Sequence, residues 1–251
     1  MEDVMINEQE RIDDLQIKNL KIIQHIKKFC FGMDAVLLSD FVDVKKDECI
    51  LDLGTGTGII PILLVGKTEA AHITGIEIQL EMAQMANRSV MLNHLSEKIK
   101  IIHGDLKEAT QLLGAGKFDI ITTNPPYMNT GLKNPEDTKA IARHEIKCTL
   151  EDVVKTGSGM LKIGGKFAMV HRPERLVDII FLMRQYKIEP KRLRMVHPYP
   201  HKRANLILIE GVRGGRAYLN MMEPLYVRNA DGSYTQEIDR IYGKDVKESG
   251  K

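Results

Sequence analysis

The sequence lacks tryptophan, and aromatic residues make up only 5% of its 251 positions, so a surface rich in aromatic side chains is not expected. It contains three cysteines, Cys30, Cys49 and Cys148, which are odd in number and widely spaced. This pattern fits neither a disulfide framework nor a zinc site, and it favours a reducing cytoplasm. We therefore expect no disulfide-stabilised fold and no metal ion.

Long hydrophobic stretches are also missing. The longest apolar runs, such as residues 59–65 and 179–183, are far shorter than the roughly 20 residues that cross a bilayer. The first residues, Met1–Val4, lack the basic region and apolar core of a signal peptide. With 43% hydrophobic and 28% charged residues, the composition suits one α/β domain, with or without a small appendage. We expect a cytoplasmic protein with no membrane partner.

Charge is distributed unevenly, although the net charge is only +2. Residues 1–14 contain six acids and one base, and we interpret them as a frayed acidic tail. Residues 184–216 contain nine Lys or Arg against two Glu. Such a basic block is either a solvated helix face with loops or the footprint of a nucleic-acid phosphate backbone. From charge alone, the first interpretation is favoured.

Short apolar segments alternate with helical patterns through most of the chain. Several, such as residues 50–53 and 118–122, run apolar without clean alternation, as strands covered on both faces do. Alternating strands and helices imply a parallel sheet with right-handed crossovers. After a first strand at 21–24, the expected strands are 50–53, 73–78, 99–103, 118–122, 165–170, 191–196 and 205–211, and the expected helices are 33–42, 59–67, 80–93, 106–113, 150–161 and 175–186.

The last two expected strands are joined by a loop with two prolines, His197–His201. The eight residues between these strands cannot hold a crossover helix, so we expect an antiparallel hairpin. The fold class is thus α/β, with a doubly wound, mostly parallel, seven-stranded Rossmann-like sheet that ends in this hairpin. The main domain is expected over residues 15–216, followed by a C-terminal extension over 217–251. Thr149, three residues before Asp152, indicates a helix capping box.

A glycine-rich turn follows the first strand of the main sheet, in Leu51-Asp52-Leu53-Gly54-Thr55-Gly56-Thr57-Gly58. Glycines let a ligand approach the backbone closely, and the following helix presents free N–H groups at its N-terminus. Glu77 ends the next strand, where a carboxylate accepts bonds from both ribose hydroxyls. Dinucleotide enzymes share such a turn. Asp52, however, would repel a pyrophosphate and can reach the amine of a methionine moiety.

A third acid follows the third strand of the main sheet, at Asp105 in His103-Gly104-Asp105-Leu106. Asp105 can accept a hydrogen bond from an adenine amine, with Leu106 covering the ring, although such an Asp taken alone is more often a helix N-cap. The three acids lie at the carboxyl ends of three successive strands. The ligand crevice of an open α/β sheet lies at that edge.

The fourth strand of the main sheet leads into Asn124-Pro125-Pro126-Tyr127, the most informative motif of the chain. Two consecutive prolines cannot donate backbone hydrogen bonds and hold φ at about −65°, so this corner is stiff. An Asn side chain, backbone carbonyls and an aromatic ring then stand together at a strand's carboxyl end. Acceptors beside a stacking ring suit a planar amide or amine that must be held in plane and made more nucleophilic.

Together these residues resemble the class I S-adenosylmethionine-dependent methyltransferases over roughly residues 30–211. Within that class, the Asn124–Tyr127 motif is similar to that of enzymes that methylate adenine N6, guanine N2 or a glutamine amide. The segment Phe31–Leu38 and the terminal hairpin narrow the resemblance to the bacterial tRNA (adenine-N6)-methyltransferases that modify the anticodon-loop region of a valine tRNA. The resemblance implies an RNA-modifying enzyme whose cofactor is S-adenosylmethionine.

The resemblance also implies roles for particular residues. The cofactor is expected to bind Asp52, Gly54, Gly56, Gly58, Glu77, Asp105 and Leu106, and the target amine to bind Asn124, Pro125, Pro126 and Tyr127. The expected partner is tRNA, with its phosphates on Arg192, Arg194, Lys202 and Arg203.

Other functions stay open from the sequence. An enzyme of the same class acting on guanine N2 of rRNA or on a protein glutamine amide is the first alternative. A nicotinamide oxidoreductase is the second. A non-catalytic RNA-binding protein is the third, and the intact Asn124–Tyr127 motif argues against it. His144 and His171 are assigned no acid–base role.

Overall fold

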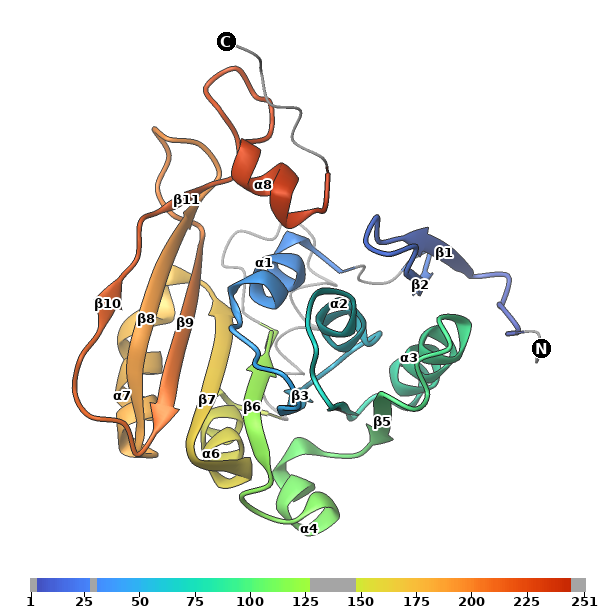
Figure 1. Cartoon of the computed structure of the whole chain (residues 1–251), viewed down its shortest axis with the longest axis horizontal. Coiled ribbons are helices and arrows are strands. Elements are labelled where there is room, and N and C mark those ends of the chain that lie inside the picture. Colours follow the sequence, from blue (N-terminus) through green and yellow to red (C-terminus); the bar gives the residue numbers. More distant parts are fainter. Residues whose placement is uncertain (1–3, 28–30, 127–147, 245–251) are drawn as a thin grey trace.

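The computed structural model describes residues 4–27, 31–126 and 148–244, with strands and helices in alternation (Figure 1). Its elements are β1 (Glu10–Asp14), β2 (Lys21–His25), α1 (Met33–Phe41), β3 (Cys49–Leu53), α2 (Ile59–Lys67), β4 (His72–Glu77), α3 (Leu80–Leu92), β5 (Ile99–His103), α4 (Ala109–Leu113), β6 (Phe118–Thr123), α6 (Leu150–Met160), β7 (Leu161–His171), α7 (Leu176–Gln185), β8 (Ile188–His197), β9 (Leu206–Arg213), β10 (Asn220–Met221), β11 (Leu225–Tyr226) and α8 (Gln236–Ile241). The expected elements are confirmed, with small shifts at their ends.

Two local predictions can be compared directly with the structure. The start of β7 differs most, because it begins at Leu161 rather than Gly165, and an irregularity in its pairing with β6 accommodates the additional residues. The capping box is confirmed, since the Thr149 hydroxyl accepts the Asp152 N–H at 3.1 Å and the Asp152 carboxylate accepts the Thr149 N–H at 2.9 Å.

The main sheet has the strand order β10-β8-β9-β7-β6-β3-β4-β5, and β11 also pairs with β8. Strands β3 to β7 pair in parallel, whereas β9 runs antiparallel to both of its neighbours, β7 and β8. The doubly wound, mostly parallel sheet with a terminal hairpin is therefore confirmed. The two-residue strands β10 and β11 are an addition, because the C-terminal extension pairs with the edge at β8.

Helices cover both faces of the sheet (Figure 1). Helices α1, α2 and α3 pack over one core, which includes Ile50 and Ile120, and helices α4, α6 and α7 pack over another, which includes Leu51 and Ile121. Because side chains alternate along a strand, neighbouring residues of β3 and β6 enter different cores. Because helices cover both faces of the sheet, these strands have nearly continuous apolar sequences.

The interpretation of residues 1–14 as a frayed tail is wrong for Glu10–Asp14, which form β1. Strand β1 pairs antiparallel with β2, and β2 packs on α3. The buried carboxylate of Glu10 accepts two hydrogen bonds of 2.6 Å from the guanidinium of Arg88 in α3. This bidentate pair lowers the pKa of Glu10 and anchors the acidic segment to the domain.

The described part of the C-terminal extension packs against the main domain. Leu225 of β11 and Ile238 and Ile241 of α8 are buried in the same core as α1. Strand β11 pairs with the carboxyl end of β8, and α8 lies next to α1 (Figure 1). Among the described residues, no helix has the length and hydrophobicity that crossing a membrane requires.

Candidate active site

The glycine-rich turn after β3 is held in an open shape by its backbone. Gly54, Gly56 and Gly58 have φ values of 70°, 56° and 82°, which glycine adopts without a steric cost. The N–H groups of Gly54 and Thr55 each donate to the carbonyl of Ile76 in β4 at 3.0 Å. A Cβ atom on Gly54 or Gly56 would meet no atom within 4 Å, so the turn borders open space where a ligand can approach its backbone.

Glu77, at the end of β4, closes this turn from the neighbouring strand. Its Oε2 accepts the N–H of Gly56 at 2.9 Å, and its Oε1 accepts the N–H of Gln79 at 2.8 Å. Each carboxylate oxygen keeps acceptor capacity after these bonds. The side chain is therefore pre-oriented to accept further hydroxyl donors beside the glycine turn.

Asp52 lies beneath the turn with no exposed surface. Its Oδ1 accepts a 2.7 Å hydrogen bond from the hydroxyl of Thr122 on β6, whereas its Oδ2 has no partner among the described residues. Burial raises the pKa of Asp52 to about 7, the Thr55 and Thr122 hydroxyls oppose this rise, and the charge of Glu77 adds to it. The Thr55 hydroxyl itself is buried and makes no hydrogen bond of normal geometry with a described residue. Buried polar atoms without partners are costly, and a ligand ammonium would satisfy this carboxylate.

Asp105 and Leu106 follow β5. The Asp105 carboxylate caps the short 3₁₀ helix 106–108 by accepting the Lys107 N–H at 2.9 Å, and it pairs with the Lys107 ammonium at 3.4 Å. Leu106 is half-buried against the core under α4 and α6. The helix-cap role of Asp105 is thus present in the structure, and its bond to an adenine amine stays a prediction.

The Asn-Pro-Pro corner begins next to the glycine turn because β3 and β6 are neighbouring parallel strands. Asp52 pairs in register with Thr122, and Leu53 pairs with Thr123. One residue further along each strand lie Gly54 and Asn124. The structure therefore brings together the two motifs that the sequence separates by about seventy residues.

The exposure of the corner suits a binding role. Asn124 is half-buried, Pro125 is buried and Pro126 is exposed. No described residue hydrogen-bonds the Asn124 side chain, so its amide is available to a substrate within this part of the chain. Tyr127, the fourth residue of the predicted motif, lies outside the described residues.

The residues present fit S-adenosylmethionine. The unpartnered Oδ2 of Asp52 suits the amine of its methionine part, the oriented carboxylate of Glu77 suits its ribose, and the open face of the glycine turn admits a ligand close to the backbone. These groups come from adjacent strands and open on one edge of the sheet, where doubly wound folds bind their ligands.

The sequence did not single out Thr122 or Thr123 as functional residues. Thr122 donates to Asp52, and the Thr123 hydroxyl donates to the Leu53 carbonyl at 3.0 Å. The available signal was two consecutive hydroxyl residues that follow Ile120 and Ile121 at the end of a strand, just before Asn124.

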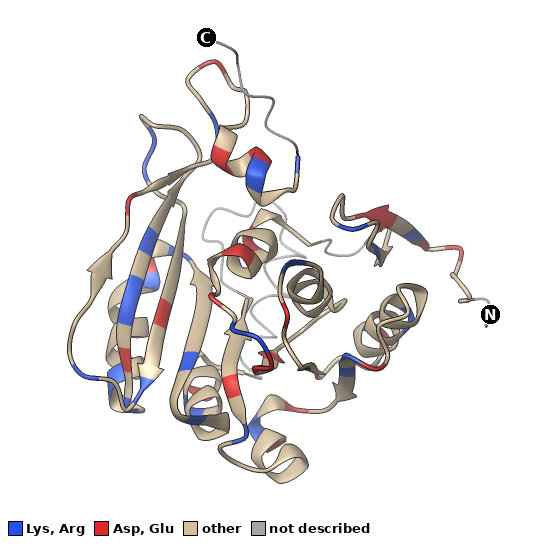
Figure 2. Ribbon diagram, in the orientation of Figure 1, with Lys and Arg blue, Asp and Glu red and all other residues tan. Residues whose placement is uncertain are grey.

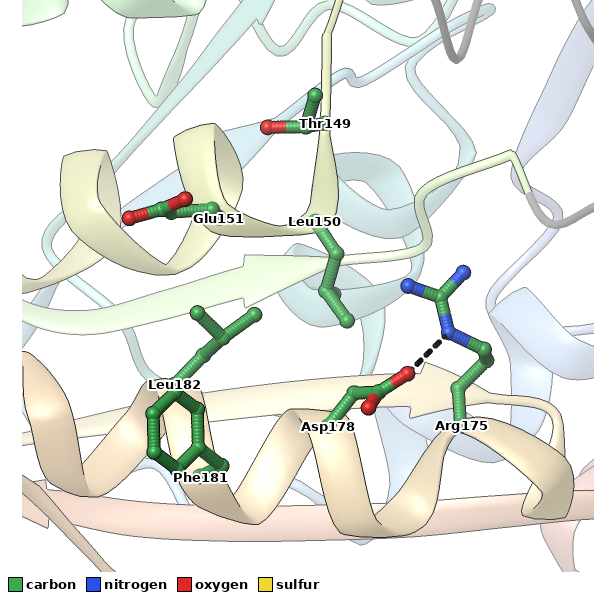
Figure 3. A pocket seen from close by; sticks show the side chains of 7 residues that line it. All are labelled: Thr149, Leu150, Glu151, Arg175, Asp178, Phe181 and Leu182. Atoms are coloured by element: carbon green, nitrogen blue, oxygen red, sulfur yellow. Dashed lines mark hydrogen bonds and ion pairs between the residues drawn. The ribbon is translucent and has the colours of Figure 1, made fainter.

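A separate hollow of about 280 Å³ lies between the start of α6 and helix α7 (Figure 3). The side chains of Leu150 and Leu182 line it, together with Phe181 and the ion pair of Arg175 with Asp178 at 2.9 Å (Figure 3). It lies on the face of the sheet that α6 and α7 cover. Asp52 and Thr122 point to the opposite face, which α1 and α2 cover, because side chains alternate along β3 and β6. None of the residues predicted to bind cofactor or substrate lines this hollow.

His171, at the end of β7, is buried, and its Nδ1 accepts the N–H of Arg172 at 2.8 Å. Burial lowers the pKa of His171 to about 4, so the ring is neutral near pH 7. A group with this pKa is a poor proton acceptor at neutral pH. His144 lies outside the described residues.

Two of the four basic residues predicted to bind RNA phosphates have partners within the chain. Arg192 donates to both oxygens of Glu210 at 2.9 and 2.8 Å and to the Phe41 carbonyl at 2.8 Å. Arg194 pairs with Glu237 of α8 at 2.8 Å. Figure 2 shows basic positions on β8 next to an acidic position on β9. Arg192 and Arg194 thus hold the hairpin to α1 and α8, and a phosphate would have to compete with these carboxylates.

The other two basic residues are free to meet a partner. Lys202 and Arg203 are exposed in the loop that joins β8 and β9, and no ion pair or hydrogen bond joins either side chain to a described residue. This loop projects from the carboxyl end of β8, the end that also receives β11 (Figure 2).

The fold and the site define a class I S-adenosylmethionine-dependent methyltransferase. Residues 30–183 match the model of the family described as Methyltransferase small domain. The chain belongs to this methyltransferase family, its cofactor is S-adenosylmethionine, and the alternative of a nicotinamide oxidoreductase is set aside.

Similar proteins agree with this assignment. A protein from Porphyromonas gingivalis named tRNA1(Val) (adenine(37)-N6)-methyltransferase is 31% identical over 218 residues, which cover 84% of this chain and 86% of that one. The structure of Atu636 from Agrobacterium tumefaciens, described as a predicted O-methyltransferase, is 25% identical with a TM-score of 0.69, over 84% of this chain and 96% of that one. Geranyl diphosphate C-methyltransferase from Streptomyces coelicolor, solved with S-adenosyl-L-homocysteine, shares the fold at 13% identity, with a TM-score of 0.54 over 72% and 78% of the two chains.

Proposed function

We propose that this protein transfers the methyl group of S-adenosylmethionine to the N6 amine of an adenine in tRNA. The observation that carries the proposal is the position of Asn124 and Pro125. They directly follow β6, which pairs with β3 up to the residue before the glycine turn. The name of the Porphyromonas gingivalis relative supports adenine N6 of tRNA as the acceptor.

The corner would act on the amine through hydrogen bonds. An exocyclic adenine amine is a weak nucleophile because its lone pair is delocalised into the ring. The Asn124 side-chain oxygen and the Pro125 carbonyl accept its two N–H groups, which favours a tetrahedral nitrogen and returns the lone pair to it. These bonds strengthen towards the transition state, so they accelerate the reaction rather than merely bind substrate. No strong base is needed beforehand, because the nitrogen becomes cationic as the S–CH3 bond breaks and then releases a proton to solvent.

The remaining assignments concern binding. S-adenosylmethionine supplies an electrophilic methyl group on a sulfonium sulfur when it is bound. We assign its methionine amine to Asp52, its ribose hydroxyls to Glu77, and its adenine end to Asp105 and Leu106. Tyr127 is assigned to stacking on the target base, a contact worth roughly 1–3 kcal/mol.

Mass mapping of the modified nucleoside tests the proposal. Purified enzyme is incubated with labelled S-adenosylmethionine and total tRNA, rRNA or protein fractions. The expected product is N6-methyladenosine in tRNA. Methylated guanine in rRNA or methylated glutamine in protein would establish the first alternative. Binding of RNA without transfer of label would establish the non-catalytic alternative.

Reversing the charges of Lys202 and Arg203 should weaken tRNA binding. The prediction now rests on these two residues, because Arg192 and Arg194 have carboxylate partners within the chain. Each lost phosphate contact should reduce the slope of log K against log salt concentration by about 0.7–0.9. Binding of tRNA to Lys202→Glu/Arg203→Glu, measured by filter binding from low to high salt, checks this.

A matched control is available on β5 and the residue before it. Lys98 and Lys100 are exposed, no ion pair joins either to a described residue, and they lie at the opposite, amino end of the parallel strands. Lys98→Glu/Lys100→Glu changes the net charge equally and should leave the salt slope unchanged. An equal loss in both variants would assign the effect to overall charge and reject the β8–β9 loop as a contact.

We also infer a cytoplasmic location, because tRNA is the proposed substrate. The methyltransferase domain is proposed to include β1 and to extend to residue 216, with residues 217–251 as an extension that packs on it through α8.

A further inference from the structure

The strands that lead to the cofactor turn and to the amine-binding corner are joined at their ends by two threonine hydroxyls. Thr122 is in register with Asp52 and donates to its Oδ1 at 2.7 Å. Thr123 is in register with Leu53 and donates to its carbonyl at 3.0 Å. Neither threonine has any exposed surface.

These two bonds lie on opposite faces of the sheet, because successive residues of a strand alternate. The preceding residues, Ile120 and Ile121, are apolar and enter one core each. Strand β6 has hydroxyl-bearing side chains only at its last two positions, which are the two nearest to the site. The ends of β3 and β6 are consequently tied together on both faces.

We propose that Thr122 and Thr123 are positioning residues that set the distance and angle between the target amine and the cofactor turn, an inference that rests on the proposed function. The Thr123 hydroxyl bonds to the carbonyl of Leu53. Thr123 directly precedes Asn124, and Leu53 directly precedes Gly54, so this bond links the chain at the start of the amine-binding corner to the chain at the start of the cofactor turn. The Thr122 bond holds one oxygen of Asp52, while Oδ2 keeps no hydrogen-bond partner among the described residues.

A small change in the distance between the target amine and the cofactor turn should affect the reaction rate more than it affects the stability of the fold. Transfer requires the reacting atoms to lie in line and close together, and a misplacement of about 1 Å costs about 10²-fold in rate. Valine has nearly the shape of threonine, and the backbone of β3 and β6 is already paired. Valine at positions 122 and 123 would therefore satisfy the packing of the strand end, so packing does not explain why both residues have a hydroxyl.

The test compares Thr123→Val with Thr123→Ser. In Thr123→Val we expect kcat to fall about 10- to 100-fold, because the amine is misplaced, while the Kd for S-adenosylhomocysteine and the KM for acceptor stay within about threefold. Thr123→Ser keeps the hydroxyl and should restore kcat. The acceptor is whichever fraction, tRNA, rRNA or protein, the wild-type enzyme labels.

Thr122→Val has a different expected signature. The Kd for S-adenosylhomocysteine, measured by calorimetry, should rise about tenfold, because Asp52 loses the bond that orients it, and Thr122→Ser should reverse the rise. Ser158→Ala provides a control for the loss of a buried hydroxyl. Ser158 lies in α6, and its hydroxyl donates to the Tyr186 carbonyl at 2.6 Å. It should lower the melting temperature without changing kcat or the Kd.

An unchanged kcat in Thr123→Val would overturn the proposal. So would a fall in kcat and ligand affinity that merely follows the melting temperature, as general destabilisation predicts. If Thr123→Val does not fold, Thr123→Ala against Thr123→Ser gives the same comparison. Failure of the proposed function is separate, because label would then enter rRNA or protein while the effects of the threonine variants remain measurable on that acceptor.

Discussion

Replacing Asn124 with alanine is expected to abolish methyl transfer while S-adenosylhomocysteine binds with near wild-type affinity. The Asn124 oxygen is proposed to accept an N–H of the target amine, and loss of one such pre-organised group typically costs on the order of 10²–10³-fold in kcat. Asn124 lies beyond the end of β6 and makes no hydrogen bond to a described residue, so the fold should tolerate the change.

Three measurements check this expectation, namely single-turnover transfer to tRNA, calorimetric titration with S-adenosylhomocysteine, and the melting temperature. Asn124→Asp is the matched variant, because it keeps an acceptor oxygen at the same place and should retain more activity than alanine. An equal loss of transfer and of ligand affinity in Asn124→Ala would mean that Asn124 is structural. The corner would then not be the amine site.

Replacing Asp52 with asparagine is expected to stabilise the fold and to remove cofactor binding. Burial raises the pKa of Asp52 to about 7 from its ordinary value of 3.8. At a pH between these two pKa values, Asp52 is ionised in the unfolded chain but still protonated in the folded chain. The free energy of unfolding therefore falls as the pH rises from about 4 to about 7. At higher pH the full cost is present, on the order of a few kcal/mol. Asparagine carries no charge and still accepts the Thr122 hydroxyl.

The melting temperatures of the wild-type protein and Asp52→Asn, measured between pH 4 and 8, test the stability half of this prediction. The variant should gain most at pH 8 and least at pH 4, and parallel profiles would contradict the cause. Calorimetry tests the binding half. Wild-type affinity for S-adenosylhomocysteine should rise as pH rises through about 7, because the ligand ammonium requires the ionised carboxylate, and Asp52→Asn should lose most of this affinity. Glu77 is the other charged group that acts on Asp52, and it stays present in both proteins.

The sheet and the cofactor turn were predictable because their signals are local. An apolar run between turn residues predicts a covered strand wherever it lies, and the turn needs positive φ at Gly54, Gly56 and Gly58, which the sequence supplies directly. The capping box of α6 depends only on Thr149 and Asp152, three residues apart. In each case the interacting groups are near neighbours in the chain, so the sequence contains the whole interaction.

The charged side chains were less predictable because their partners are distant. Glu10 was assigned to a tail, but Arg88, which lies 78 residues away, holds it in a buried pair. Arg192 and Arg194 were assigned to RNA, but Glu210 and Glu237, 18 and 43 residues away, accept their guanidinium groups. A charged residue in a sequence needs a partner, but the sequence does not identify that partner. Solvent, a phosphate or a carboxylate can each stabilise an Arg side chain.

The sequence by itself therefore determined the order of strands and helices, the open glycine turn, the acids at three strand ends and the stiff Asn-Pro-Pro corner. Only the tertiary structure decided that Thr122 and Thr123 join the end of β6 to the end of β3, and that one oxygen of Asp52 has no partner among the described residues. The reason is that backbone preference acts within a few residues, whereas these bonds exist only after β3 and β6 have paired across 70 residues of chain.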